Sequence, residues 1–487
     1  MQDTRLIRLI RTFTREELKS FGKFLESPFL RPARNTIILY NYIIKFQPDF
    51  DTDKLEKRNV FKNIFPEESY NEKKILNFIF DLNKAAEDFL AYNTLMTDET
   101  ELLISLSKGY LSKNLSEESN RVNKLIEKKL KPGFSRSKDY ISKFRRLNSI
   151  KGIYFSEKND FKNLFECQKE DFEASSVQFI FDYTKIISSS TPALASYGID
   201  LKNDFINSVI QSFNFEKLLK VVEKSGFRDK HLVLLHYYLL KINLDNTNSK
   251  FYYLLRDLFY ELLSELDREE KHFIFEYLIN FCVQNFINPE FKKEALEVCR
   301  KMLDNNSYSN FENEYMEVMI YRNIVFFCIT LRDGDYLEEF IEKYSGTLKP
   351  GIRMDLKNFS YAQLYYMKGE YEKSLESCSK INQEFSIFKT DSKNLLLINY
   401  YELNYFESAF SMVDSYRHFL SNSKEITDVY KRDYSNFLNL YFDLLKIKAQ
   451  QGKENPSFIK NKISKEKNIV NKKWLLTKAD ELIKKYK

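Results

Sequence analysis

Apolar residues recur at the spacing of an amphipathic helix along almost the whole chain, and this pattern constrains the fold more than any other feature. Leu6, Leu9 and Ile10 begin it, and no run of strict apolar–polar alternation, the pattern typical of strands, interrupts it. Gly and Pro, on which turns and sheet corners depend, number only 11 and 9 among 487 residues. The sequence therefore predicts an all-α fold, and its 43% of hydrophobic residues are enough to form a core.

Residues 1–95 predict a compact N-terminal domain of five helices. Thr14 and Glu17 have the spacing of a capping box, in which each side chain satisfies the backbone N–H of the other. We expect the fourth helix to open at Asp53 and the fifth, the longest, to start at Asn71, because both residue types cap helices.

Beyond this domain the pattern becomes pairs of helices separated by short polar breaks. One helical hairpin cannot bury its own apolar face, so consecutive hairpins are expected to stack. We predict degenerate hairpins over 96–312, regular repeats over 313–420, and C-terminal helices over 421–487. The last helix is expected to be a basic, amphipathic cap of the stack, with an apolar face formed by Trp474, Ala479, Leu482, Ile483 and Tyr486.

The clearest internal repeat has a period of 35 residues. Gly334, Gly369 and Asn404 are evenly spaced, and an aromatic residue stands two positions after each. Gly and Asn suit the left-handed conformation in which many helices end, so we expect each to lie in a tight turn inside a hairpin. Small residues such as Ser374 and Ala409 follow where two helices would cross closely.

This pattern resembles the tetratricopeptide repeat, best of all over Tyr361–Leu375, which carries the Gly, the Tyr and the small residues of that motif. The resemblance implies a right-handed superhelix of stacked hairpins. The chain also resembles an uncharacterised family of bacterial helical-repeat proteins in two short blocks, Phe24–Leu30 and Lys473–Leu476. That family implies no particular activity.

Sequence motifs for catalysis, cofactors or metals are not found. The chain lacks HExxH, GxSxG and glycine-rich phosphate loops, and it has only four His. His231 and His236 are five residues apart and therefore do not share a helix face. We expect no enzyme activity, no cofactor and no metal, and a role in recognising another protein or peptide as an adaptor or scaffold.

The resemblance to tetratricopeptide repeats also suggests a binding surface. In such arrays the first helix of each pair lines the concave face, which would place Gln363, Tyr366, Ile398 and Tyr401 there. Tyr is a good contact residue because it offers a large, rigid surface at low entropic cost. The alternative is that these residues only pack between repeats.

A second hypothesis is a regulator that binds nucleic acid through the basic stretch 121–151 or the N-terminal helices. That stretch holds 11 Lys and Arg against two acidic residues, and its candidate phosphate contacts are Arg136, Lys143, Arg145 and Arg146. The segment from Leu55 to Phe89 resembles winged-helix domains of bacterial transcriptional regulators, although no β-hairpin wing is visible. The alternative for the basic residues is a solvated or protein-facing surface.

The remaining features favour the cytoplasm. The five Cys show no paired spacing and stand mostly among apolar residues, as buried free thiols do in a reducing compartment. No signal-peptide pattern opens the sequence, and the longest apolar run, 324–329, is too short to cross a membrane. We expect no membrane partner.

Overall fold

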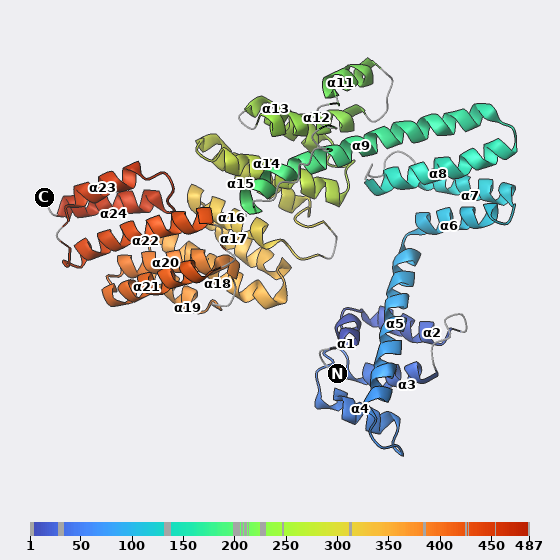
Figure 1. Ribbon diagram of the computed structural model, residues 1–487, viewed down its shortest axis with the longest axis horizontal. Coiled ribbons are helices and arrows are strands. Elements are labelled where there is room, and N and C mark those ends of the chain that lie inside the picture. Colours follow the sequence, from blue (N-terminus) through green and yellow to red (C-terminus); the bar gives the residue numbers. More distant parts are fainter. Residues whose placement is uncertain are drawn as a thin grey trace. The chain divides into compact units, whose positions relative to one another are not determined.

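The computed structural model describes residues 4–27, 34–130, 138–197, 214–224, 230–245, 248–310, 314–382, 386–423, 428–452 and 454–485, together with four single positions. All regular structure in these residues is helical, and none of them lies in a strand (Figure 1). The predicted all-α class is therefore confirmed.

The chain divides into two compact units, one formed by residues 1–132 with 140–174, and the other by 133–139 with 175–487. The finer division into four domains stays a prediction. The helices of the first unit are α1 (Arg5–Ile10), α2 (Arg15–Leu25), α3 (Arg34–Ile43), α4 (Lys57–Ile64), α5 (Glu72–Thr97), α6 (Glu99–Leu111), α7 (Ser116–Lys129) and α8 (Lys138–Glu157), with 3₁₀ turns at Ile44–Phe46 and Asp53–Leu55. Helix α9 (Phe161–Tyr197) begins in the first unit and continues into the second.

The N-terminal helices α1 to α5 share one apolar core. The capping box is present: Glu17 N donates to Thr14 Oγ1 and Thr14 N donates to a Glu17 carboxylate oxygen at 2.8 Å. Asn71 caps α5 as predicted. The fourth helix begins later than predicted, at Lys57, because Asp53 opens a 3₁₀ turn and the extended backbone of Glu56 separates the two.

The second unit is a series of helices that contact their neighbours in the chain. They are α11 (Phe215–Lys224), α12 (Lys230–Leu244), α13 (Ser249–Glu261), α14 (Arg268–Gln284), α15 (Pro289–Asp304), α16 (Val318–Leu331), α17 (Gly334–Tyr344), α18 (Pro350–Lys368), α19 (Tyr371–Ser379), α20 (Ser386–Glu402), α21 (Phe406–Asn422), α22 (Asp428–Lys448), α23 (Pro456–Lys465) and α24 (Lys472–Lys485), with a 3₁₀ turn at Ser345–Thr347. Each packs on the helix beside it or the next but one, as α18 does on α19 and α20 (Figure 1). This pairing of neighbours is the predicted stack of hairpins.

Small residues allow the close helix crossings inside this stack. Ser374 is fully buried, and its hydroxyl donates to the Ala362 carbonyl at 2.7 Å while accepting from Asn399 Nδ2 at 2.8 Å. One buried hydroxyl thus joins α18, α19 and α20. A larger side chain at this point would force the helices apart.

The turns of the repeat differ from the sequence alignment at one position. Gly369 and Asn404 adopt the predicted left-handed conformation, with φ of 78° and 60°. In the preceding hairpin, however, the left-handed residue is Arg332, and Gly334 is already the first residue of α17. Asp333 caps α17 by accepting from Tyr336 N, which fixes this start. Gly334 is small for another reason, because a Cβ there would lie 2.8 Å from Met367 Cε.

Replacing Gly369 isolates the energetic cost of the left-handed turn. A Cβ at this position would meet no atom within 4 Å, so Gly369→Ala changes only the backbone conformational energy. We expect a loss of about 1 kcal/mol in the free energy of unfolding, measured by urea denaturation. The control is Gly351→Ala on the same helix, where φ is not positive and space is also open. It should instead be neutral or stabilising, and equal losses in both variants would contradict the argument.

Within the residues that the structure describes, we find no helix that combines the length and the apolar character needed to cross a membrane. All five Cys are buried and free, as predicted from their spacing.

Candidate functional site

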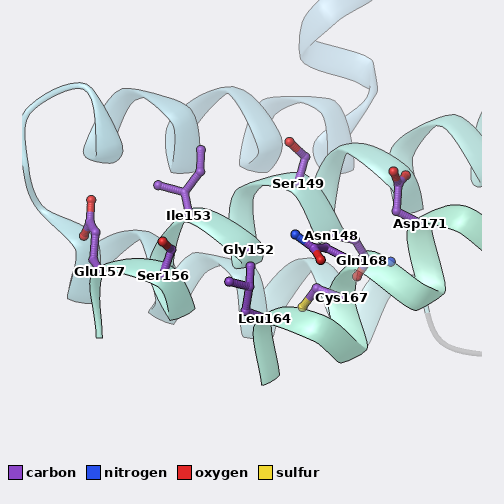
Figure 2. A pocket seen from close by; sticks show the side chains of 10 residues that line it. All are labelled: Asn148, Ser149, Gly152, Ile153, Ser156, Glu157, Leu164, Cys167, Gln168 and Asp171. Atoms are coloured by element: carbon purple, nitrogen blue, oxygen red, sulfur yellow. The ribbon is translucent and has the colours of Figure 1, made fainter. Parts of the chain in front are cut away.

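Helices α8 and α9 form a hairpin in the first unit, and a groove of about 430 Å³ lies between them. The chain reverses at Asn159, whose φ is 55°, and Asp160 caps α9 by accepting from Asn163 N. Figure 2 shows the side chains that line the groove: Asn148, Ser149, Gly152, Ile153, Ser156 and Glu157 from α8, and Leu164, Cys167, Gln168 and Asp171 from α9.

Asn148 distinguishes this groove from an ordinary gap between helices. Its side chain is only 2% exposed, because the neighbouring Leu147 and Ile150 belong to the apolar core that α8 shares with α6 and α7. Neither Oδ1 nor Nδ2 of Asn148 has a hydrogen-bond partner among the described residues. A buried amide that forms no hydrogen bond costs about 1 to 3 kcal/mol for each unsatisfied group. Both polar atoms are themselves almost inaccessible to solvent, so a bound molecule would pair with them only after the side chain turns towards the groove.

The other polar groups in the groove are mostly neutral hydrogen-bonding groups. They include the hydroxyls of Ser149 and Ser156 and the amide of Gln168. Burial raises the pKa of the Cys167 thiol, so it stays protonated at neutral pH and is a poor nucleophile. At one end the Asp171 carboxylate accepts from Arg145 Nε at 3.0 Å. This arrangement suits binding rather than covalent chemistry.

Exposed aromatic side chains lie on α9 beside the groove. Phe161, Phe165 and Phe172 are 56%, 63% and 73% exposed. Their spacing of four and seven residues places them along one helix face, which also contains the groove residue Gln168. Apolar side chains gathered at the surface of a protein are a feature of interaction sites.

The basic residues predicted to contact phosphates are engaged in ion pairs. Each described member has a carboxylate partner within the first unit: Asp98 for Lys143, Asp171 for Arg145 at 3.0 Å, and Glu101 for Arg146 at 2.6 Å. Lys143 is also largely buried, with 9% exposure. Arg136 lies outside the described residues. A phosphate would therefore have to displace carboxylates from these cations.

The ion pair between Asp98 and Lys143 is supported by further hydrogen bonds to the Asp98 carboxylate. It caps α6 by accepting from Glu101 N at 2.9 Å and also accepts from Lys143 Nζ. Burial alone would raise the pKa of Asp98, but the hydrogen bonds from Lys143 and from the backbone outweigh it and hold the pKa below its usual value. The carboxylate is therefore ionised at neutral pH and keeps Lys143 occupied.

The residues predicted to line a concave surface lie on α18 and α20. Gln363 and Tyr366 are half-buried on α18, whereas Ile398 and Tyr401 on α20 are only 5% and 1% exposed. The Tyr401 ring packs against Trp474, with centroids 5.1 Å apart. Ile398 and Tyr401 thus have almost no exposed surface, and the assignment of a concave binding face stays a prediction.

The histidines occupy separate environments. His231 Nε2 lies 3.6 Å from a Glu265 carboxylate oxygen, while His236 is stacked on Phe181 and bonded through Nδ1 to Thr184. Burial lowers the pKa of His236 to about 3. One group among the described residues could share a cation, and it is formed by His272, Glu276 and Glu317 in the second unit.

The sequence alone does not identify Asn148 as a site residue. The available signal was an amide next to apolar Leu147 on a helix otherwise regular in pattern. An Asn at such a position often bonds to a neighbouring side chain or backbone carbonyl. Whether Asn148 has such a partner depends on which side chains of α9 face it, and the sequence does not give this.

No protein-family model matches this chain, and no curated protein or solved structure matches it either.

Proposed function

We propose that the chain is a non-catalytic adaptor that recognises an extended peptide segment of a partner protein in the groove between α8 and α9. The observation that carries this proposal is the buried Asn148 amide without hydrogen-bond partners among the described residues. A peptide backbone presents C=O and N–H groups in alternation, which complement the donor and the acceptor of an Asn side chain. Exposed Phe165 and Phe172 would add apolar contact beside that polar anchor.

We also propose that the hairpins from α16 to α21 are tetratricopeptide-like and that the protein is a cytoplasmic, bacterial one. The left-handed turns at Gly369 and Asn404 and the buried crossing residues Ser374 and Ala409 support the repeat assignment. The buried free thiols support a reducing compartment.

The proposal predicts that an aromatic beside the groove contributes to binding. Peptides would be selected from a phage-displayed random library on the full chain, and their affinities measured by fluorescence polarisation. Phe165→Ser should weaken binding by more than about 10-fold, as expected for loss of an aromatic anchor. The matched control is Phe80→Ser, because Phe80 is 67% exposed, similar to Phe165, but lies on α5, a helix that contributes no residue to the groove. Equal effects of the two substitutions would contradict the assignment.

The alternative function, nucleic-acid binding, is tested separately by measuring affinity for mixed-sequence DNA at several salt concentrations. Affinity for mixed-sequence DNA that falls steeply with salt, and that Arg145→Gln with Arg146→Gln abolishes, would favour a regulator that binds phosphates. The ion pairs of these two residues with Asp171 and Glu101 make us expect weak binding.

A further inference from the structure

Three potential metal ligands converge in the second unit. His272 and Glu276 are four residues apart on α14, so both project from one helix face, and Glu317 is the residue that precedes α16. His272 Nε2 lies 3.7 Å from a Glu276 carboxylate oxygen and 3.6 Å from a Glu317 carboxylate oxygen. The three ligand atoms all lie within 4.8 Å of one another.

The imidazole of His272 is oriented as metal-binding histidines commonly are. Its Nδ1 is 2.9 Å from the Ser307 carbonyl oxygen, and since a carbonyl only accepts, Nδ1 carries the hydrogen and donates it. In the neutral imidazole, Nε2 then carries the lone pair, on the side of the two carboxylates. A backbone carbonyl that fixes the tautomer in this way is a usual outer-shell partner of a metal-bound His.

Nε2 of His272 is buried and unsatisfied. The side chain is 2% exposed, and Nε2 has no hydrogen-bond partner in the described part of the chain. Distances of 3.6 and 3.7 Å to the carboxylates are too long for hydrogen bonds. They are close to the roughly 3.4 Å that separates two ligands bound tetrahedrally to Zn²⁺ at about 2.0–2.1 Å.

The two carboxylates lie on the same side of His272 and carry like charges. Glu317 occupies the N-cap position of α16, yet its side chain makes no capping hydrogen bond. A divalent cation between the two groups would offset their repulsion and pair with the lone pair of His272.

We propose that His272, Glu276 and Glu317 bind a divalent first-row transition cation, with Zn²⁺ the best match. Imidazole together with carboxylates selects such ions over Mg²⁺ and Ca²⁺, which prefer oxygen ligands alone. Three protein ligands leave one position for water. The cation would tie α14 to the start of α16 and so join two consecutive hairpins.

The test is calorimetric titration of the full chain with Zn²⁺ after removal of metals by EDTA. We expect one Zn²⁺ per chain, an increase in the unfolding temperature on binding, and no competition from excess Mg²⁺. His272→Gln and Glu317→Gln should each weaken binding by more than about 10-fold, the least that loss of even an outer-shell partner causes.

The matched control is His231→Gln. His231 makes a similar contact with a carboxylate, at 3.6 Å from Glu265, but belongs to no three-ligand group in the described residues. This variant should bind Zn²⁺ as the native chain does. Circular dichroism in EDTA reports whether each variant folds. If His272→Gln unfolds, the Zn²⁺ affinity of Glu317→Gln tests the proposal, because Glu317 is half-exposed and its replacement should not unfold the chain. Absence of Zn²⁺ binding to the native chain, or unchanged affinity in Glu317→Gln, would overturn the proposal.

Discussion

Replacing Glu402 with Leu is expected to reduce the free energy of unfolding of the second unit by about 3 kcal/mol. Glu402 lies at the end of α20 with its side chain 10% exposed. It accepts from Lys478 Nζ of α24 at 2.9 Å and from Trp474 Nε1 at 2.9 Å. The substitution would leave the largely buried Lys478 ammonium with only Glu481, which is itself 57% exposed, and would leave the indole N–H without its acceptor.

The cost comes from a cation that stays charged. Burial alone would lower the pKa of Lys478, but its hydrogen bonds with Glu481 and Glu402 outweigh burial and raise the pKa. The ammonium is therefore present at neutral pH. Its contribution to stability is complete below the usual Lys pKa and is lost only when the pH rises through the raised value.

Urea denaturation of the variant measures this loss, and two further variants test its cause. Glu338→Leu removes the partner of Lys368, a pair of the same 2.9 Å length but with side chains 52% and 37% exposed, and should cost less than about 1 kcal/mol. Lys478→Met added to Glu402→Leu should recover most of the loss, because no unpaired charge then remains buried. A loss in Glu402→Leu no larger than in Glu338→Leu would refute the explanation.

Local signals explain why most of the fold was predictable. The capping box at Thr14 and the cap at Asn71 depend on residues within one helical turn, and both are present. Gly334 shows the limit of this reasoning. A Gly required for a left-handed turn and a Gly required for close contact with Met367 look the same in a sequence, so the alignment placed the turn two residues from its position at Arg332.

The candidate site was less predictable, since it depends on distant partners. Lys143 and Arg146 belong to a basic stretch of the sequence, but each forms an ion pair with a carboxylate 45 residues away. These carboxylates neutralise much of the positive charge that a phosphate would meet. Tyr401 is covered by Trp474, which belongs to α24, four helices later in the chain. His272 was not assigned to a metal site, because its third partner stands in another hairpin.

Replacing Asn148 with Leu is expected to stabilise the first unit while abolishing peptide recognition. Leu is close to Asn in shape and removes the two buried polar atoms that form no hydrogen bond with described residues. We expect the free energy of unfolding to rise by about 1 to 3 kcal/mol, because their desolvation is no longer required. Affinity for selected peptides should fall below detection, since the only deeply buried polar anchor of the proposed groove is lost.

A control separates the two effects. Gly109→Ala on α6 lies in the same unit, at a helical position where a Cβ meets nothing within 4 Å, and it does not line the groove. It should raise stability by about 0.5 to 1 kcal/mol and leave peptide affinity unchanged.

Thermal unfolding and fluorescence polarisation on the same samples measure both quantities. A destabilised Asn148→Leu would mean that the amide is satisfied within the free protein, and full peptide affinity in this variant would exclude Asn148 as the anchor. An amide that lowers stability in the free protein and is also required for peptide affinity would be explained by binding, because a side chain that served folding alone would be better replaced by Leu.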